Sequence, residues 1–514
     1  MSVSTVKLNG TTLMTVNDTT ATAGDVLGKY FYAADGTKTL GTAASQSGSS
    51  DGDVIFIDYD GTVVGSKSKS QINAMTSNSE LPTNPTHEGL VAQGWNWTVT
   101  QLKAQLTAMP NQKVYVGQMY VTQSGATEID VVMHEGRLDP ILTICVNGTA
   151  TVDWGDNTTP DTVTGSSETT RLEVSHTYAS EGDYTISISN TSGTYSFYGD
   201  SNRQYTLLRK NITGNENKIY ANCIQEIRLG NGISNIRDCA FISCYSPSSI
   251  TIPSGVTSIG TSAFQYCYSL SSITIPSNVT SIGGSLFSGC YSLSSITIPY
   301  GVKSIGSSAF YGCYGLLCIT IPSGVTSIGG SAFNSCYSFS SVNIPSNVTS
   351  IGNNAFSSCY ALSSITIPSN VTSIGGSAFY YCYSLSSVTI PSGVTSIGSN
   401  AFNCCYSLLN VTIPSSVTSI GGSAFSYCNS LSSITIPSGV TSIGSNAFSS
   451  CYGVAEYHLL PTTVPTLGAT AFINIVSDCK IYVPYSADHS ILAAYQSETN
   501  WADYASYMVE EPAP

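Results

Sequence analysis

The sequence predicts a mainly β, multidomain protein whose second half is a solenoid with a period of 23 residues. Phenylalanine and cysteine keep this period from Phe241 to Phe448 and from Cys244 to Cys451, with no insertion or deletion. The ten cysteines predict about ten turns. Proline recurs at the same interval, at Pro253, Pro276, Pro299, Pro322, Pro345, Pro368, Pro391, Pro414 and Pro437.

One turn, from Ser272 to Ser294, shows how the period builds a coil. Thr274 lies between two isoleucines, as in a short strand with one buried face. Pro276 ends this strand because proline has no amide for a ladder, and Gly283 with Gly284 predicts a corner. Turns stacked about 4.8 Å apart would bury the apolar residues that one turn leaves exposed. The residues expected to point inward are Ile273, Ile275, Val279, Ile282, Leu286, Phe287, Cys290 and Leu293.

The pattern SITIPsgVTSIGssAFxxCysL resembles the BspA-type leucine-rich repeat, which occurs in many bacterial surface proteins and some viruses. The resemblance covers about Ala221 to Tyr452 and implies a leucine-rich-repeat solenoid over residues 199–452. Members of that family mostly bind other molecules. The fold alone does not identify the ligand.

Sixteen cysteines raise the question of disulfides or metal ligands. Ten of them occupy one equivalent position, so their side chains should point the same way in a buried, reduced column, whereas a disulfide needs Cβ atoms that face each other. Cys318 replaces an outward serine and is expected to be an exposed thiol. The five histidines are scattered and no CxxC occurs, so no metal site and no cofactor are predicted.

Two rows of residues are candidates for ligand binding. The first row is the tyrosine after each cysteine, because tyrosine offers a flat apolar face and a hydroxyl to sugars and protein partners. Its members are Tyr245, Tyr268, Tyr291, Tyr314, Tyr337, Tyr360, Tyr383, Tyr406 and Tyr452, with Asn429 as the exception. Alternatively, these tyrosines stack on one another as a structural column. The second row is the pair of positions before each cysteine, which varies while the interior is constant, and its surface candidates are Gln265, Tyr266, Tyr311, Asn334, Tyr380, Tyr381 and Tyr427.

Residues 1–50 form a small N-terminal module followed by a Gly/Ser linker, SQSGSSDGD. The module resembles one common in tail proteins of phages that infect Gram-positive hosts, through Asp18, Gly28, Lys29, the run Asp35–Thr37 and Gly41. This resemblance implies attachment to other virion or tail proteins through the N-terminal region.

Residues 51–137 are expected to form a small α+β module. Asp58 and Asp60, in DYDGTVV, resemble the first motif of haloacid-dehalogenase phosphatases, in which they would act as nucleophile and general acid. That chemistry also needs Mg²⁺, further acidic residues and a lysine on a doubly wound sheet. The next hundred residues show no alternating strand–helix pattern, so we interpret the motif as a hairpin turn.

The same module contains two tryptophans and one short helical pattern. The pattern predicts a helix over Val99–Met109, capped by Thr98. Trp95 and Trp97 are interpreted as core residues, with a sugar-binding platform as the alternative.

Residues 138–198 resemble a PKD-type β-sandwich, a domain that serves as a spacer or weak binding module in extracellular and viral proteins. The residues that carry this resemblance are Trp154, Gly155, Asp156, His176, Tyr178, Gly182 and Tyr184. Asp153 and Asp156 are two carboxylates, too few for the six-oxygen shell of Ca²⁺, so we expect them to stabilise a turn.

Residues 453–514 resemble the terminal cap of BspA-type proteins. The pattern predicts a strand at IYVP, a helix around Ser490 to Gln496 and a turn at Asn500–Trp501. A solenoid needs such a cap to cover its last turn.

Composition excludes several functions. The net charge of −14 and the pI near 4.6 argue against nucleic acid, whose phosphates require clustered Lys and Arg. The sequence contains no run of eighteen apolar residues, so we predict no membrane-spanning helix. Between Ser246 and Ala455 the only charged residue is Lys303, so the solenoid lacks the carboxylate pair that glycoside cleavage requires. We therefore expect a protein that is not an enzyme.

Two kinds of binding protein remain. The first 16 residues lack the basic start and apolar run of a signal peptide, and no anchor motif is visible at the other end. With the tail-like module, this favours a virion component: a phage tail fibre or receptor-binding protein whose solenoid contacts a glycan or protein of the host surface. The second kind is a BspA-like adhesin on a bacterial cell surface, and within the virion kind a capsid decoration protein is the alternative to a tail fibre. A trimer, common among tail fibres, and a monomer are both compatible with the sequence.

Overall fold

The structure is a computed structural model of the 514-residue chain. It describes residues 125–199, 207–210, 220 and 222–513, and before them the segments 5–8, 11–15, 30–32, 38–40, 54–57, 63–75, 80–83, 90–95, 99, 102–103 and 114–122. The chain divides into two compact units, Met1–Ser124 and Gly125–Pro514. This division places residues 125–137, assigned above to the α+β module, in the second unit.

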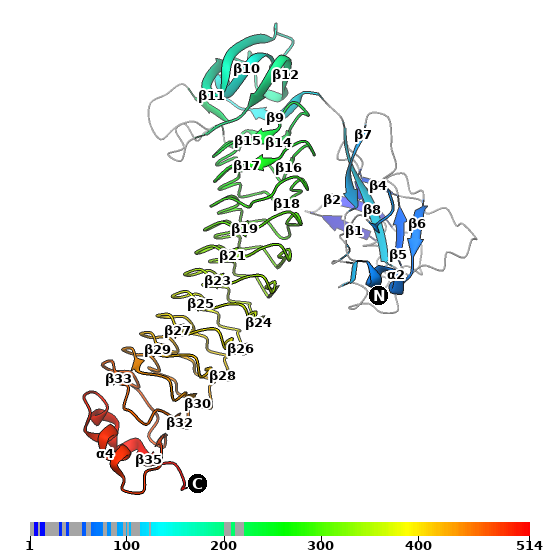
Figure 1. Cartoon of the computed structure of the whole chain (residues 1–514). Helices are drawn as coiled ribbons and strands as arrows, with labels where there is room; N and C mark the ends of the chain where they lie inside the picture. Colours follow the sequence, from blue (N-terminus) through cyan, green and yellow to red (C-terminus); the bar gives the residue numbers. More distant parts are fainter. Residues whose placement is uncertain are drawn as a thin grey trace. The chain divides into compact units, whose positions relative to one another are not determined.

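The first unit contains a four-stranded sheet and two short hairpins (Figure 1). The hairpins pair β1 (Thr5–Leu8) with β2 (Thr11–Thr15) and β3 (Tyr30–Tyr32) with β4 (Lys38–Leu40). The sheet has the order β6-β5-β8-β7, with β5 at Val54–Ile57, β6 at Val63–Lys67, β7 at Leu90–Trp95 and β8 at Val114–Thr122. The short helix α2 (Lys69–Ala74) begins at a capping box formed by Ser68 and Gln71.

Several predicted features of this unit can be placed only in part. Strands β5 and β6 pair antiparallel, as the predicted hairpin requires, while Asp58 and Asp60 lie outside the described residues. The rest of the tail-like module, Trp97 and the side chain of Trp95 also lie outside them. Of the predicted helix Val99–Met109, the described residues include Val99, Leu102 and Lys103. The described core of the unit consists of Val54, Phe56, Ile72, Met75, Val99 and Leu102.

The second unit begins with four long antiparallel strands. They are β9 (Thr127–Met133), β10 (Pro140–Asp153), β11 (Asp161–Ser175) and β12 (Gly182–Ser196), in the order β11-β10-β12-β9, and the short β13 (Leu208–Lys210) pairs with the start of β10. The burial pattern alternates along β9 and the first half of β12, as expected where one face of a sheet covers a core, whereas the first seven residues of β10 are all buried. Whether these strands form a PKD-type sandwich stays a prediction.

The turn after β10 confirms the role expected for its two aspartates. Asp153 accepts a hydrogen bond from the amide of Gly155 at 2.9 Å, and Asp156 accepts one from the Thr158 hydroxyl at 2.6 Å and contacts the His176 ring at 2.8 Å. Trp154 is buried above this turn and stacks on His176, with ring centroids 4.8 Å apart. Desolvation raises the pKa of Asp156, but the hydrogen bonds from Thr158 and His176 outweigh it and lower that pKa from its usual range.

Strand β9 joins this sheet directly to the solenoid. It pairs antiparallel with β12 on one edge and with β14 (Ile224–Arg228) on the other, and β14 then pairs in parallel with β16 (Ser249–Thr251). The guanidinium of Arg228 contacts Asp130 at 2.6 and 2.9 Å and Glu128 at 2.9 Å across this seam. Strands β9 to β12 and the first strands of the solenoid, β14, β16 and β18, therefore form one continuous sheet.

The solenoid consists of two parallel ladders of short strands (Figure 1). The first ladder starts at β14 and β16 and continues through β18 (Ser272–Ile273), β20 (Cys318–Thr320), β22 (Ser341–Asn343), β24 (Ser364–Thr366), β26 (Ser387–Thr389), β28 (Asn410–Thr412), β30 (Ser433–Ile436), β32 (Glu456–Leu459) and β34 (Lys480–Val483). The second ladder runs through β15 (Asn235–Ile236), β17 (Ser258–Ile259), β19 (Ser304–Ile305), β21 (Ser327–Ile328), β23 (Ser350–Ile351), β25 (Ser373–Ile374), β27 (Ser396–Ile397), β29 (Ser419–Ile420), β31 (Ser442–Ile443) and β33 (Thr466–Leu467). Isolated bridges continue each ladder where a rung has no named strand, at Thr297 in the first ladder and at Ile282 in the second.

The solenoid has about 12 turns rather than the ten predicted. The difference arises because pairing continues past Cys451 through β32 and β34, where the repeat cysteine is absent and Ile475 stands in its place. All of the residues expected to point inward are buried, and their exposed fractions in the turn Ser272–Ser294 are 7 % or less. The predicted interior is therefore confirmed.

The corner of most turns uses glycine for close approach. A Cβ on Gly352 would lie 2.5 Å from the backbone nitrogen of Gly330 in the preceding turn, so a larger residue does not fit there. The left-handed backbone falls two residues later, on Ser or Asn, for example Asn354 with φ of 56°. The predicted glycine pair thus marks the corner, but the sharp bend itself is made by its neighbour.

The C-terminal cap matches the predicted elements. The expected strand is β34, the expected helix is α4 (Ser490–Ser497), and Asn500 has φ of 64° in the expected turn. Trp501 is fully buried and donates a hydrogen bond to the carbonyl of Pro465 at 2.7 Å. The last strand, β35 (Met508–Glu510), pairs with β34 and closes the sheet.

Candidate functional site

The tyrosine row forms a continuous stack on the surface of the solenoid. Eight rings lie face to face, with adjacent centroids 4.6 to 5.1 Å apart and planes within 10° of parallel. The stacked rings are Tyr245, Tyr268, Tyr291, Tyr314, Tyr337, Tyr360, Tyr383 and Tyr406. This is the structural column that the sequence left open as an alternative.

The stack determines which part of each tyrosine a partner could reach. Because neighbouring rings cover both faces of an interior ring, the exposed 36 to 38 % of Tyr291, Tyr314 and Tyr337 belongs to ring edges and hydroxyl ends. A sugar ring therefore cannot lie flat on an interior tyrosine, whereas hydrogen bonds to a row of hydroxyls are open. Tyr452 is 52 % exposed and stands beyond Asn429, outside the stack.

Asn429 marks an interruption of the repeat. The amide oxygen of its side chain is buried without a hydrogen-bond partner. In the same region the first ladder is broken between β28 and β30, whereas the second ladder runs through without a break. The missing ring and the missing strand pairing thus coincide.

Within the stack, the pKa values of Tyr314, Tyr383 and Tyr406 are raised. Desolvation and then the neighbouring rings Tyr291 and Tyr337 raise the pKa of Tyr314 to about 12. A hydrogen bond with Cys404 is the main reason that the pKa of Tyr406 also rises to about 12. These hydroxyls are therefore neutral donors and acceptors at physiological pH.

The variable pair lies beside the stack, at a second left-handed corner. The residue directly before each cysteine has positive φ, with values of 62° at Tyr266, 60° at Tyr381 and 60° at Tyr427. Glycine occupies this position in two turns, and the other turns carry Ser, Tyr or Cys there. The ring of Tyr266 meets that of Tyr268 edge-on at 6.1 Å, so the variable pair and the tyrosine stack form one surface.

The predicted variable residues differ in exposure. Tyr311 and Tyr427 are the most exposed, at 44 and 43 %. Tyr380 and Tyr381 stack on each other with centroids 3.9 Å apart, and their mutual hydrogen bond is the first cause of the raised pKa of Tyr380. The remaining predicted positions, Gln265, Tyr266 and Asn334, are half-buried.

The cysteine column is a ladder of hydrogen bonds that sequence reasoning did not predict. From Cys267 to Cys451, each of the nine thiols of the column donates to the carbonyl of the phenylalanine in the preceding turn, as in Cys336 to Phe310 at 3.1 Å and Cys359 to Phe333 at 3.2 Å. All sixteen cysteines are free, and Cys318 is the exposed one, as predicted. The signal in the sequence was the invariant choice of cysteine where a purely apolar residue would fill the same space.

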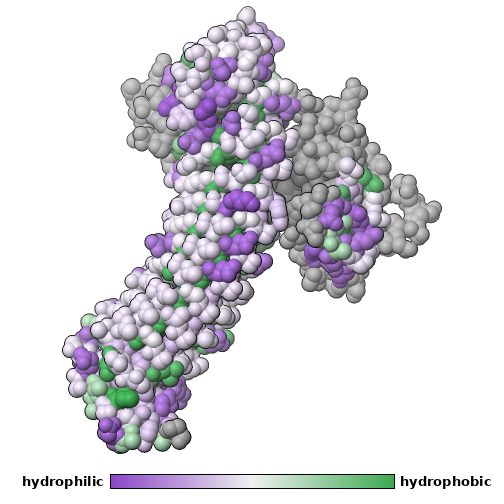
Figure 2. Space-filling model, viewed as in Figure 1, coloured by the Kyte–Doolittle hydropathy of each residue, from purple (hydrophilic) through white to green (hydrophobic). Residues whose placement is uncertain are grey.

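Serine and threonine hydroxyls bond the turns in the same manner. Ser363 donates to the carbonyl of Ser340, and Thr441 to that of Thr418, each one turn earlier. Polar groups on the surface are thus matched without charge. Serine, threonine and glycine have hydropathy near zero and charged residues are almost absent, so most of the solenoid is pale in Figure 2.

Within the described part of the chain, no three His, Cys, Asp or Glu side chains lie close enough to hold a metal ion. No helix among those residues is both long and apolar enough to cross a membrane.

The repeat geometry agrees with a family match. Residues 190–317, 280–408 and 395–499 match the BspA type leucine rich repeat region, so the matched span covers more than half of the chain. The chain belongs to the BspA-type leucine-rich repeat family. No curated protein sequence matches the chain significantly.

Solved structures with similarity to this BspA-type protein come from several bacteria. A leucine rich cell surface protein from Faecalibacterium prausnitzii is 27 % identical, with a TM-score of 0.35, over 52 % of this chain and 91 % of that one. A leucine-rich repeat protein from Bacteroides ovatus is 27 % identical, with a TM-score of 0.30, over 63 % and 97 %. A leucine rich repeat protein from T. pallidum is 31 % identical, with a TM-score of 0.31, over 32 % and 80 %.

Proposed function

We propose that this chain is an adhesin-type surface protein that binds a partner through its solenoid and catalyses no reaction. The observation that carries the proposal is the row of stacked tyrosines whose edges lie beside the variable corner. The buried positions repeat from turn to turn, while the exposed pair before each cysteine changes. A constant scaffold with a changing surface is suited to recognition.

The chemistry of this surface favours a neutral partner. Lys303 is the only charged residue between Ser246 and Ala455, so ionic attraction contributes little along the solenoid. Tyrosine hydroxyls, serines and threonines offer hydrogen bonds to a glycan or to an uncharged protein surface. The same lack of carboxylates supports a binding function rather than glycoside cleavage.

Binding of the fluorescently labelled full chain to bacterial cells, epithelial cells and mucin tests the proposal. The triple variant Y291F/Y314F/Y337F removes three hydroxyls but keeps the stacked rings. We expect it to weaken binding about tenfold, a loss of about 1.4 kcal/mol. The matched control T320V/T366V/T389V changes the exposed face of the first ladder and should bind normally. Equal loss in both variants, or no binding to any surface, would contradict the proposal.

A phage tail fibre is the second candidate, favoured by the resemblance of the run Asp18–Gly41 to a tail module. In that case the N-terminal region would attach to other tail proteins and the solenoid would contact the host. Immunogold electron microscopy of purified particles and of cells from the source culture separates the two. Gold on cell envelopes supports the adhesin, gold at tail tips supports the tail fibre, and gold on capsids supports a decoration protein.

A further inference from the structure

A pocket lies where the sheet of strands β9 to β12 meets the first turns of the solenoid, and its lining includes none of the stacked tyrosines. Its volume is about 380 Å³, within the usual range for small-molecule sites. It is lined by Tyr198, Asn235, Ile236, Arg237, Asp238, Ser258, Ile259 and Gly260. From this lining we infer a second binding site, specific for a small neutral sugar of one or two rings.

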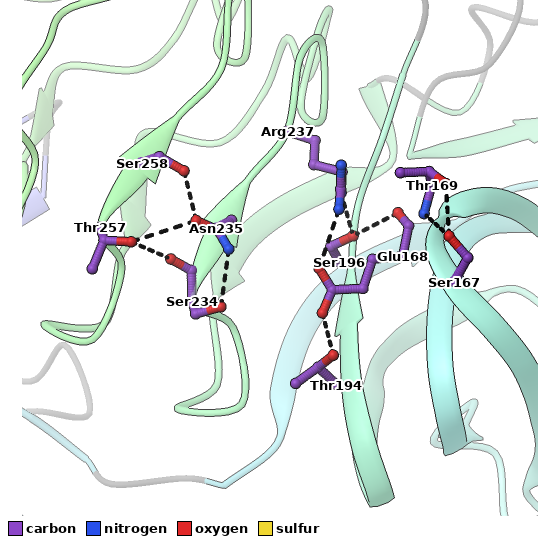
Figure 3. Close-up of polar contacts among 10 residues, drawn as sticks. All are labelled: Ser167, Glu168, Thr169, Thr194, Ser196, Ser234, Asn235, Arg237, Thr257 and Ser258. Atoms are coloured by element: carbon purple, nitrogen blue, oxygen red, sulfur yellow. Dashed lines mark hydrogen bonds and ion pairs between the residues drawn. The ribbon is translucent and has the colours of Figure 1, made fainter.

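The arginine of the pocket is held in place by the neighbouring sheet (Figure 3). Its Nε donates to the Ser196 hydroxyl at 3.1 Å and its Nη2 to the Glu168 carboxylate at 3.2 Å. Glu168 in turn accepts a hydrogen bond from the Thr194 hydroxyl. The guanidinium is therefore oriented before any ligand arrives, which lowers the entropic cost of binding.

Two further polar side chains of the pocket are fixed by the solenoid. One carboxylate oxygen of Asp238 accepts the amide of Thr261 at 2.7 Å, and no described residue bonds the other oxygen. The amide oxygen of Asn235 accepts the Ser258 hydroxyl at 2.6 Å (Figure 3). The pocket thus holds these side chains in fixed positions and leaves one Asp238 oxygen open to a donor from a ligand.

An aromatic ring completes the lining. The guanidinium carbon of Arg171 lies 4.9 Å from the ring centroid of Tyr198, a cation–π contact that holds the ring in position. An aromatic ring with fixed planar side chains matches a sugar, which has an apolar face of C–H groups and an edge of adjacent hydroxyls.

The charges around the pocket select against ionic ligands. Glu168 balances the charge of Arg237, which leaves Asp238 as the one carboxylate of the lining without an ion pair among the described residues. Arg171, which lies on the ring of Tyr198, has the opposite charge to Asp238, so these four charged side chains sum to zero and give no excess cation for an anion. The site therefore fits a neutral polyhydroxylated ligand rather than a phosphate or a carboxylate.

Saturation-transfer NMR of the full chain with maltose, cellobiose, lactose, N,N′-diacetylchitobiose and glucuronate tests the site. We expect at least one neutral disaccharide to bind with a Kd on the order of 1 mM, more tightly than glucuronate. Ser258→Tyr fills the pocket and should abolish binding. Ser281→Tyr is the matched control, because Ser281 holds the same position one turn later and does not line the pocket.

If the Ser258→Tyr variant does not fold, the Asp238→Asn variant is used in its place. Asparagine keeps an acceptor for the Thr261 amide. Binding of this variant should fall at least fivefold, and sugar should slow hydrogen exchange in residues 235–238 and 258–260. No sugar binding, equal binding of glucuronate, or equal loss in both serine variants would overturn the inference. The variant Y291F/Y314F/Y337F should leave this site unchanged, so failure here is separate from failure of the proposed adhesin surface.

Discussion

The cysteine of each repeat fills a buried position and donates a hydrogen bond to the turn before it. Serine would keep the donor but leave a smaller, more polar group, and alanine would lose the hydrogen bond. Because the thiols are shielded, burial raises the pKa of Cys244 to about 12 and raises that of Cys290 well above its usual range. A neutral, buried thiol reacts slowly, since the thiolate is the nucleophile.

We therefore predict that one thiol of the sixteen reacts rapidly with Ellman's reagent in the native protein, and that this thiol is Cys318. The remaining thiols should react after addition of guanidinium chloride. Cys318→Ala should abolish the fast phase and leave thermal stability unchanged. Rapid reaction of several thiols in the native protein would show that the column is open to solvent.

The raised pKa of Tyr314 predicts how stability depends on alkaline pH. Below pH 10, the usual pKa of tyrosine, the ring is neutral in both folded and unfolded chains, so pH has no effect through this group. Between pH 10 and about 12 the unfolded chain loses this proton while the folded chain keeps it, so the free energy of unfolding falls. Urea unfolding at several pH values measures this fall, which Tyr314→Phe should reduce.

At the scale of the element, Asn429 interrupts the tyrosine stack. Replacing Asn429 by Tyr would place a ring between Tyr406 and Tyr452 and remove a buried amide oxygen that has no partner. Each new ring pair contributes about 0.5 to 1.5 kcal/mol, so N429Y should raise the free energy of unfolding by about 1 to 3 kcal/mol.

Thermal unfolding followed by circular dichroism measures the effect of N429Y. Asn410→Tyr is a suitable control, because it adds a ring on the exposed face of β28, away from the stack. A melting temperature that is unchanged or lower in N429Y would show that Asn429 is required where it stands.

The corner glycines belong to the same scale. Gly352→Ala would put a Cβ 2.5 Å from the backbone of Gly330 and should cost about 1 to 3 kcal/mol through overpacking. Gly301→Ala is the control, because its Cβ would have no neighbour closer than 3.8 Å. The melting temperatures of the two variants, compared with the parent protein, decide whether close approach is the reason for glycine.

The periodic elements could be predicted from the sequence because a period fixes which residues face inward. The residues that occupy the positions of Ile273 and Phe287 in the other turns have the same environment, so the pattern itself identified the core. The thiol ladder was not predictable, since it depends on the distance from a side chain to a backbone carbonyl in the neighbouring turn. Ring stacking followed from the period only as an alternative, because spacing does not determine whether rings face each other or the solvent.

At the scale of the whole second unit, one sheet runs from β11 into the solenoid through β9 and β14. Strand β9 lies outside the repeat, so no periodic signal predicted that it would pair with β14, and the sequence assigned β9 to a different module. Arg228 holds this seam through Glu128 and Asp130. The pocket beside Arg237 depends on the same junction and was not predicted for the same reason.

Arg228→Gln should loosen this seam, because it removes the ion pairs that hold Glu128 and Asp130. We expect a loss of about 2 kcal/mol in local stability, measured as faster hydrogen exchange in β9 and β14. Lys303→Gln, an exposed change in the solenoid, should leave exchange in these strands unaltered. Unchanged exchange in R228Q would show that strand pairing alone holds the seam.

The identical spacing of the rungs also bears on how such a gene can change. A turn presents to its successor the same carbonyls and amides that its predecessor presented to it, as the matching bonds Phe287 to Ala309 and Phe310 to Ala332 show. Unequal recombination that removes or adds 23 codons would therefore give a shorter or longer coil with both ends intact. The length of the solenoid and the number of variable corners could then differ between strains, while each turn still packs on its neighbours in the same way.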